Sequence, residues 1–222
     1  MEEIFERVMQ EKKVPHHLRQ TVCEEMRHGI EVSNLAKMIA EEMGESEEVI
    51  KDLEIAGILH DIGKLKLTKY MYSEDGLIVE QMKYVRQHTK QSSEIVKAAG
   101  YGDRIAQAVY YHHENCDGSG YPDNLHKDEI PKLAKILRVC DVFIALTTDR
   151  SYRKAFDPKT ALEIMIDEVV DYDMNVFLAF QRVLHRHVFR MGMEKMRSAT
   201  SEKQYEVLEL FFKEMEFLYY TR

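Results

Sequence analysis

The sequence has few cysteines and no long apolar stretch, and each absence excludes a class of protein. Its three cysteines among 222 residues, Cys23, Cys116 and Cys140, have no CxxC spacing. They form no evident disulfide framework, which is typical of a reducing compartment. No segment approaches the roughly 18 consecutive apolar residues of a membrane helix. The N-terminus also lacks the basic start and apolar core of a signal peptide. We therefore expect a soluble, cytoplasmic protein that does not enter a membrane.

Positive charge is also in short supply. The chain has 31 Lys and Arg against 39 Asp and Glu, a net charge of −8 at pH 7. This acidic balance disfavours non-specific binding to a nucleic-acid backbone, so we predict no DNA or RNA partner. It does not exclude a small anionic substrate, because bound metal ions and a few local basic residues can reverse the field inside one cleft.

The alternation of apolar and polar residues that marks strands is scarce, and most of the sequence has helical periodicity instead. One clear stripe lies between Val32 and Met43 and ends at Gly44, a typical C-terminal cap. Ser46, Asp157 and Asp173 precede other apolar stripes and are expected N-caps. With 45% hydrophobic and 32% charged residues, the composition is that of an ordinary globular domain. The sequence predicts an all-α fold.

Several predicted helices end or interrupt their apolar face with a histidine or an aspartate. These residues are His28, His60, His88, His112, His113 and Asp141. A single histidine on an apolar face is more often an ordinary core residue than a ligand, but five of them reverse that expectation. Burying so many imidazoles and carboxylates uncompensated would cost several kcal/mol per unpaired charged group. Metal cations would neutralise the carboxylates and use the imidazole lone pairs, so the set predicts a metal site.

Asp61 directly follows His60 and is the residue best suited to join two cations. A carboxylate can bridge two ions, whereas an imidazole binds one. The candidate ligands include no thiolate, which favours iron, manganese or other borderline divalent ions over structural zinc.

Two motifs complete the pattern, His60-Asp61-Ile62-Gly63-Lys64 and Asp117-Gly118-Ser119-Gly120-Tyr121-Pro122. Together with the histidines and Asp141, over roughly residues 20 to 185, they resemble the HD-GYP family, metal-dependent phosphodiesterases of bacterial cyclic dinucleotides. The resemblance implies an HD-domain-type helical bundle with an extra C-terminal helix. It also implies a centre of two or three divalent transition-metal ions, iron or manganese.

The resemblance implies a role for each matching residue. Its two-metal pattern falls on His28, His60, Asp61, His88, His112, His113 and Asp141, with Asp61 as the bridging carboxylate. A third ion would add Glu24, one helical turn before His28, unless Glu24 is a surface residue. Lys64 would act beside Asp61 in catalysis, as an electrostatic partner of the phosphate or a proton donor to the leaving oxygen. The implied substrate contacts are Lys64, Gly120, Tyr121, Pro122, Arg150 and Arg153.

The sequence departs from the family pattern at a few positions. Ile144 stands where an aspartate is common, Asn115 and Cys116 follow His-His-Glu where an arginine is usual, and Ser151 replaces a proline. None of these changes removes an implied metal ligand. They bear instead on substrate preference and turnover.

The implied activity is hydrolysis of cyclic di-GMP to pGpG, GMP or both by a metal-bound hydroxide. Two alternatives stay open: a phosphohydrolase for another nucleotide, such as a hybrid cyclic dinucleotide, and a weakly active module that binds cyclic di-GMP and signals through a partner. We expect a short helical segment over residues 1–19, the phosphodiesterase domain over 20–190, and a C-terminal helical extension over 191–222. That extension would pack on the core or on the partner of a homodimer.

Overall fold

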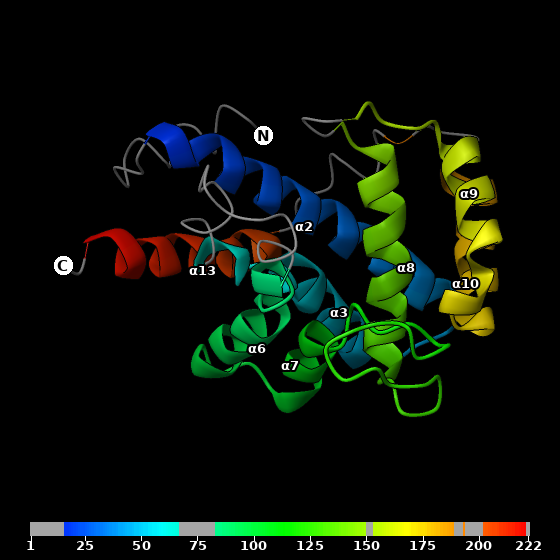
Figure 1. Cartoon of the computed structure of the whole chain (residues 1–222), viewed down its shortest axis with the longest axis horizontal. Helices are drawn as coiled ribbons and strands as arrows, with labels where there is room; N and C mark the ends of the chain where they lie inside the picture. Colours follow the sequence, from blue (N-terminus) through cyan, green and yellow to red (C-terminus); the bar gives the residue numbers. More distant parts are fainter. Residues whose placement is uncertain (1–15, 67–82, 150–152, 189–192, 194–201, 221–222) are drawn as a thin grey trace.

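The computed structural model describes residues 16–66, 83–149, 153–188, 193 and 202–220 (Figure 1). Within these ranges the regular structure is helical, apart from isolated bridge residues, among them the antiparallel pair Asp117 and His126. This confirms the all-α prediction for the described part of the chain. None of its helices combines the length and the apolar character needed to cross a bilayer. Arg150, an implied substrate contact, and Ser151, one of the departures from the family pattern, lie outside the described residues.

The long helices have the following bounds: α2 His16–Glu42, α3 Glu47–Leu59, α6 His88–Ala98, α7 Asp103–Tyr110, α8 Lys132–Thr147, α9 Pro158–Asp167, α10 Met174–Val183 and α13 Glu202–Tyr220. A 3₁₀ turn, η1, spans Val169–Asp171, and a π-helical turn, η2, spans Leu184–Val188. Figure 1 shows α8 between the α9–α10 pair on one side and α3 and α7 on the other. The helix α2 packs against α3, α8 and α10, so these elements surround one core.

Three helices begin at the N-caps that the sequence predicts. The Ser46 hydroxyl accepts from the Val49 amide (3.4 Å) at the start of α3. Asp157 and Asp173 each accept from two amides at the starts of α9 and α10. These side chains satisfy amide groups that have no partner within the helix. The expected helix whose apolar face contains His88 is not continuous. A turn at Arg86 and Gln87 interrupts it, so α6 begins only at His88.

Two glycines allow α2 and α3 to approach each other closely. A Cβ atom on Gly57 would lie 2.6 Å from Ser33 Cα, and one on Gly29 would lie 2.6 Å from Ile58 O. No side chain fits at either position without moving a backbone. A glycine inside a helix costs roughly 1 kcal/mol relative to alanine, and here the close crossing offsets that cost. The crossing also brings His28 beside His60.

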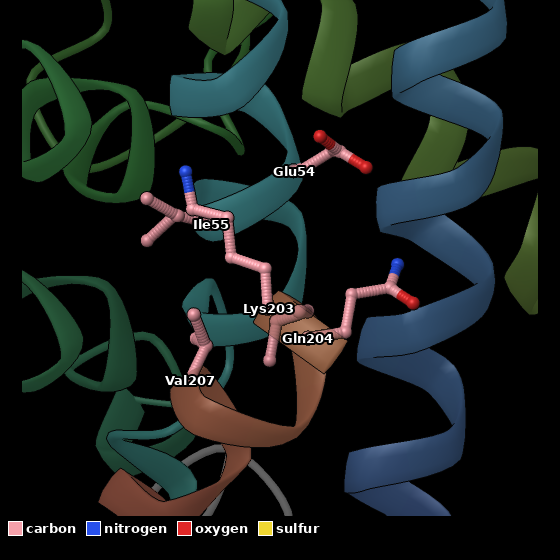
Figure 2. A pocket seen from close by; sticks show the side chains of 6 residues that line it. Glu54, Ile55, Lys203, Gln204 and Val207 are labelled. Carbon is pink, nitrogen blue, oxygen red and sulfur yellow. The ribbon is translucent and has the colours of Figure 1, made fainter. Parts of the chain in front are cut away.

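The C-terminal helix α13 packs against α3 and α2. Val207, Leu208 and Phe211 are buried there, and Gln204 Nε2 donates to Asn34 Oδ1 (2.9 Å). Figure 2 shows the small pocket that remains between α3 and α13 and is lined on one side by Lys203. Because α13 covers α3, it lies on the core of its own chain. The division into three segments and the homodimer stay predictions.

Candidate metal centre

The turn that follows α3 presents two adjacent candidate ligands. The helix ends at Leu59, and His60 and Asp61 stand in a tight turn in which the Lys64 amide donates to the Asp61 carbonyl (2.9 Å). The Gly63 amide donates to Ser92 Oγ in α6 (2.8 Å). A Cβ on Gly63 would collide with the backbone of α6. The turn is therefore seated directly on the start of α6, which carries His88.

The candidate ligands gather into two groups that share Asp61. One group contains Asp61, His88, His112 and His113, and the other contains His28, His60, Asp61 and Asp141. Within each group, one ligand atom per residue lies within 4.8 Å of every other. The structure thus brings together all seven residues of the two-metal pattern, from α2, α3, α6, α7 and α8 or the turns that follow them.

The two carboxylate oxygens of Asp61 face different groups. Its Oδ1 lies 3.1 Å from His88 Nε2 and 3.9 Å from His112 Nε2. Its Oδ2 lies 3.2 Å from His60 Nε2 and 3.9 Å from His28 Nε2. This arrangement is the one that a bridging carboxylate requires.

Three of the histidines are oriented by the same local contact. In each, Nδ1 lies at hydrogen-bond distance from the carbonyl oxygen of the residue three positions earlier. The pairs are His60 with Gly57 (2.8 Å), His88 with Val85 (2.6 Å) and His112 with Val109 (2.6 Å). A carbonyl oxygen only accepts, so Nδ1 carries the proton and the neutral ring keeps the lone pair of Nε2. That lone pair points toward Asp61, as a metal ligand needs.

Asp141 closes the second group from the middle of α8. Its Oδ1 lies 2.9 Å from His28 Nε2, and its Oδ2 lies 3.9 Å from His113 Nδ1. It is buried, as the apolar stripe on both sides of it predicts. The two Asp141 oxygens therefore face His28, in one candidate ligand group, and His113, in the other.

The charge states in the absence of metal follow from burial and from the two aspartates. Burial lowers the pKa of His112 well below its usual value and that of His113 to about 3. At His60 burial also lowers the pKa, but the charges and hydrogen bonds of Asp61 and Asp141 together outweigh it and raise the pKa to about 10. Burial alone would raise the pKa of Asp61 and Asp141, yet the surrounding histidines hold both well below the usual range. Ionised carboxylates beside the neutral imidazoles of His112 and His113 suit a cation, which would take the place of the proton on His60.

Two buried atoms support the fit of a cation to this site. Asp61 Oδ1 and His60 Nε2 have no partner in hydrogen-bonding geometry among the described residues, although ring nitrogens or carboxylate oxygens lie 3.1–3.2 Å away. Buried polar atoms in folded proteins are nearly always hydrogen-bonded. Lone pairs that converge without sharing a proton are what a metal ion would satisfy.

Lys64 lies against the shared carboxylate. Its Nζ is 2.5 Å from Asp61 Oδ2 and 3.5 Å from Glu25 Oε2. Burial lowers the pKa of Lys64, but Asp61 and Glu25 more than compensate and raise it above its usual value. The ammonium group therefore stays charged and holds the position of Asp61.

The Gly-Tyr-Pro segment packs directly on the paired histidines. The Tyr121 ring stacks on the His113 ring at 4.7 Å between centroids, and its amide donates to the His113 carbonyl (3.1 Å). A Cβ on Gly120 would collide with the backbone of Asn115. Gly120 thus permits this close approach, and Pro122 follows in a cis peptide bond.

Residues 114–125 are held by Glu114, a residue that no sequence pattern singles out. The buried Glu114 carboxylate accepts from the Asp123 amide (2.6 Å) and the Leu125 amide (3.0 Å). Asn115, one of the departures from the family pattern, accepts from Arg138 Nε (2.9 Å). The available signal for Glu114 was its place directly after His113, followed by a loop whose backbone amides need acceptors.

Two implied residues are not brought to the site. Glu24 is exposed on α2, where it accepts from Gln20 Nε2 (3.0 Å), and Glu25 faces Lys64 instead. The Arg153 guanidinium donates to the carbonyls of Ala145 (2.8 Å) and Leu146 (3.1 Å) at the end of α8. The last carbonyls of a helix have no partner within it, so Arg153 serves as a cap in this structure.

Comparison with known proteins identifies related sequences. Residues 6–176 match the family described as HD domain. The chain is 36% identical over 136 residues to the cyclic di-GMP phosphodiesterase response regulator RpfG of Xanthomonas campestris, covering 59% of this chain and 35% of that protein. It is 30% identical over 160 residues to 3'3'-cGAMP-specific phosphodiesterase 3 of Vibrio cholerae, covering 71% and 35%. The chain thus spans about a third of the length of these curated relatives.

Solved structures share the fold. A cyclic GMP-AMP-specific phosphodiesterase of Vibrio cholerae superposes with a TM-score of 0.60 at 15% identity, over 85% of this chain and 54% of that one. Bd1817, an HDG"Y"P protein of Bdellovibrio bacteriovorus, superposes with a TM-score of 0.59 at 19% identity, over 72% and 52%. The helical arrangement around the candidate metal centre is therefore found in solved proteins.

Proposed function

The chain belongs to the HD domain family, and from that premise we propose that it is a metal-dependent phosphodiesterase that hydrolyses cyclic di-GMP to pGpG, GMP or both. The observation that carries this proposal is the placement of Asp61, whose two oxygens face two separate groups of histidines. The choice of cyclic di-GMP as substrate rests on relatives that are named cyclic di-GMP phosphodiesterases. The three cysteines form no disulfide in the described part of the chain, which supports a cytoplasmic setting.

We propose that each group of ligands holds one divalent ion. His28, His60, Asp61 and Asp141 would hold the first, and Asp61, His88, His112 and His113 would hold the second. Two ions that share a site supply Lewis acidity toward the phosphodiester and a nucleophile from water at neutral pH. Imidazole and carboxylate ligands without thiolate favour iron or manganese.

The residues around the ligands would orient the substrate and hold charge. Lys64 keeps its proton because Asp61 and Glu25 raise its pKa. This favours an electrostatic role over donation of a proton to the leaving oxygen. Tyr121 stacks on His113 and so lies at the ligand sphere itself, where its ring or hydroxyl would contact the dinucleotide. Glu114 would fix the loop that carries Tyr121.

A hybrid cyclic dinucleotide is the second candidate substrate. The relatives named as 3'3'-cGAMP-specific are as similar to this chain as several that are named for cyclic di-GMP. Both substrates carry two phosphodiesters, so the metal groups alone do not separate them.

The proposal is tested with the 222-residue chain, purified anaerobically without chelator. We expect about two transition-metal ions per chain and hydrolysis of cyclic di-GMP ahead of 3'3'-cGAMP and cyclic di-AMP in a substrate panel. Less than one ion after reconstitution with iron or manganese would contradict the metal centre. Two ions without hydrolysis of any cyclic dinucleotide would contradict the activity and favour a binding module.

Glu24→Gln tests the third ion that the family resemblance implies. Glu24 is exposed in this structure and bonded to Gln20. We therefore expect the variant to keep the wild-type metal content, measured by elemental analysis, and wild-type hydrolysis. Loss of one ion per chain would show that Glu24 turns inward to complete a trinuclear centre.

A further inference from the structure

Arg86 lies at the rim of the candidate metal centre, in contact with Tyr121. Its guanidinium carbon is 5.0 Å from the centroid of the Tyr121 ring. The His113 ring is stacked on the same tyrosine ring, so both the guanidinium and a candidate metal ligand lie against Tyr121. Tyr121 thus connects the exposed Arg86 to the buried candidate ligands.

The backbone that carries Arg86 is held by two side-chain hydrogen bonds. The Val85 carbonyl accepts from His88 Nδ1 (2.6 Å), and the Arg86 carbonyl accepts from Thr89 Oγ1 (3.3 Å). Both donors belong to the first turn of α6, which carries a metal-ligand candidate. The position of the arginine is therefore tied to that of the site, although its side chain is exposed.

Other cations near the site are already engaged. Lys64 faces Asp61 and Glu25. Arg138 donates to Asn115 and lies 3.9 Å from an Asp171 oxygen. Arg153 donates to backbone carbonyls. Arg86, by contrast, makes no ion pair with any residue in the described ranges. In a chain with a net charge of −8, a cation that has no anionic partner among the described residues and lies beside a candidate substrate residue is available for an anionic ligand.

We propose that Arg86 forms a phosphate subsite that binds the second phosphodiester of a cyclic dinucleotide, the one that is not being cleaved. This inference rests on the proposed function. A cyclic dinucleotide carries two phosphodiesters, and the proposed metal centre would engage one of them in each hydrolysis. The other keeps its negative charge and needs a partner outside the metal site. A guanidinium offers paired N–H donors to phosphate oxygens and can do so while stacked on an aromatic ring.

The subsite predicts a particular kinetic signature. A contact with a phosphodiester that does not react is equally strong in the ground state and the transition state. Its removal therefore raises KM and leaves kcat near the wild-type value. We expect Arg86→Ala to raise KM for cyclic di-GMP about tenfold, the effect of losing one exposed charged hydrogen-bonding contact. Hydrolysis of bis(p-nitrophenyl) phosphate, which has a single phosphodiester, should be unchanged.

Three further variants separate charge from packing. Arg86→Gln keeps a planar group over Tyr121 but removes the charge, so it should resemble Arg86→Ala. Arg86→Lys keeps the charge and should recover part of the lost affinity. Lys97→Ala removes one positive charge from the other end of α6, where Lys97 is exposed and lies 3.6 Å from Asp103. It controls for net charge and should behave as wild type on both substrates.

The outcomes of this experiment are distinct. Equal losses on both substrates, or loss of metal from Arg86→Ala, would mean that Arg86 supports the metal site or the fold, and would overturn the inference. A wild-type KM in Arg86→Ala or Arg86→Gln would also overturn it, while leaving the proposed function intact. A wild-type protein that hydrolyses the generic ester but no cyclic dinucleotide would overturn the proposed function and the subsite together.

Discussion

At the scale of single residues, the site depends on how each imidazole is turned. His60, His88 and His112 all donate from Nδ1 to a carbonyl three residues earlier. The backbone thereby selects the tautomer before any ion arrives, and the Nε2 lone pairs converge on Asp61. The sequence indicates these residues because each ends an apolar stripe. It does not indicate Glu25, Arg86 or Glu114, because their partners come from other segments and follow no local periodicity.

Asp61 is the single residue whose loss should affect both ions. In Asp61→Asn, one carboxylate oxygen becomes an amide nitrogen, which is a poor ligand and cannot bridge. We expect metal content to fall below one ion per chain and hydrolysis of cyclic di-GMP to be abolished, measured by elemental analysis and product chromatography. Asp103→Asn, at the exposed start of α7, serves as the control and should retain both. Wild-type hydrolysis by Asp61→Asn would contradict the assigned role.

The buried histidines should make the metal-free protein sensitive to acid. The pKa of His113 is about 3 in the folded state, against about 6.5 in an unfolded chain. Between these values the unfolded state binds a proton that the folded state does not. The free energy of unfolding therefore decreases as the pH falls from about 6.5. His60, with its pKa raised to about 10, acts in the opposite sense, but above pH 6.5.

This dependence can be measured by urea unfolding between pH 6.5 and pH 5 in the presence of a chelator. One proton at His113 should account for roughly 2 kcal/mol over that interval. His113→Gln removes the titrating group and should lose correspondingly less stability. The same slope in wild type and variant would show that His113 does not control it.

At the scale of helices and loops, local sequence predicts N-caps well but does not always predict which side chains interrupt or cap a helix. Ser46, Asp157 and Asp173 cap the helices they were expected to cap, because capping needs only neighbouring amides. The late start of α6 was not predicted. There the Val85 carbonyl accepts from the His88 side chain, and such side-chain contacts compete with regular helix bonding. Likewise, charge alone does not tell whether Arg153 meets a substrate or a helix end.

The crossing of α2 and α3 should tolerate no side chain at Gly57. In Gly57→Ala the new Cβ would lie 2.6 Å from Ser33 Cα, so one helix must shift. Overpacking of this kind typically costs roughly 1–3 kcal/mol, and the shift would also separate His28 from His60. We expect lower stability in chemical denaturation together with lower metal content. Gly102→Ala, where a Cβ meets nothing within 4 Å, is the matched control and should remain close to wild type.

At the scale of the whole molecule, the ligands are widely separated in the sequence but adjacent in the fold. They extend from His28 to Asp141 and come from five helices or the turns after them. The resemblance between short motifs predicts that they meet, whereas periodicity alone indicates only that each is buried. How α13 lies over α3 and α2 did not follow from either, because an amphipathic helix fits any apolar surface of suitable shape.

Metal removal should therefore weaken the entire fold. An ion that binds only the folded state stabilises it by about 2.7 kcal/mol when its free concentration is a hundred times the Kd. We expect chelation to lower the Tm of the wild-type protein and added manganese to restore it, measured by scanning calorimetry. Asp61→Asn should show little change on either addition. A wild-type Tm that is indifferent to chelator and metal would contradict a centre built from five helices.

The carboxylate shared between the two groups links the amount of folded protein in a cell to its supply of metal. Because the ligands converge only in the folded chain, uptake of ions and folding are a single equilibrium. A cell short of divalent metal would hold a larger fraction of this chain open, and open chains are the ones that proteases degrade. Metal supply would then set the abundance of the protein as well as its activity, and a shortage of metal would lower both.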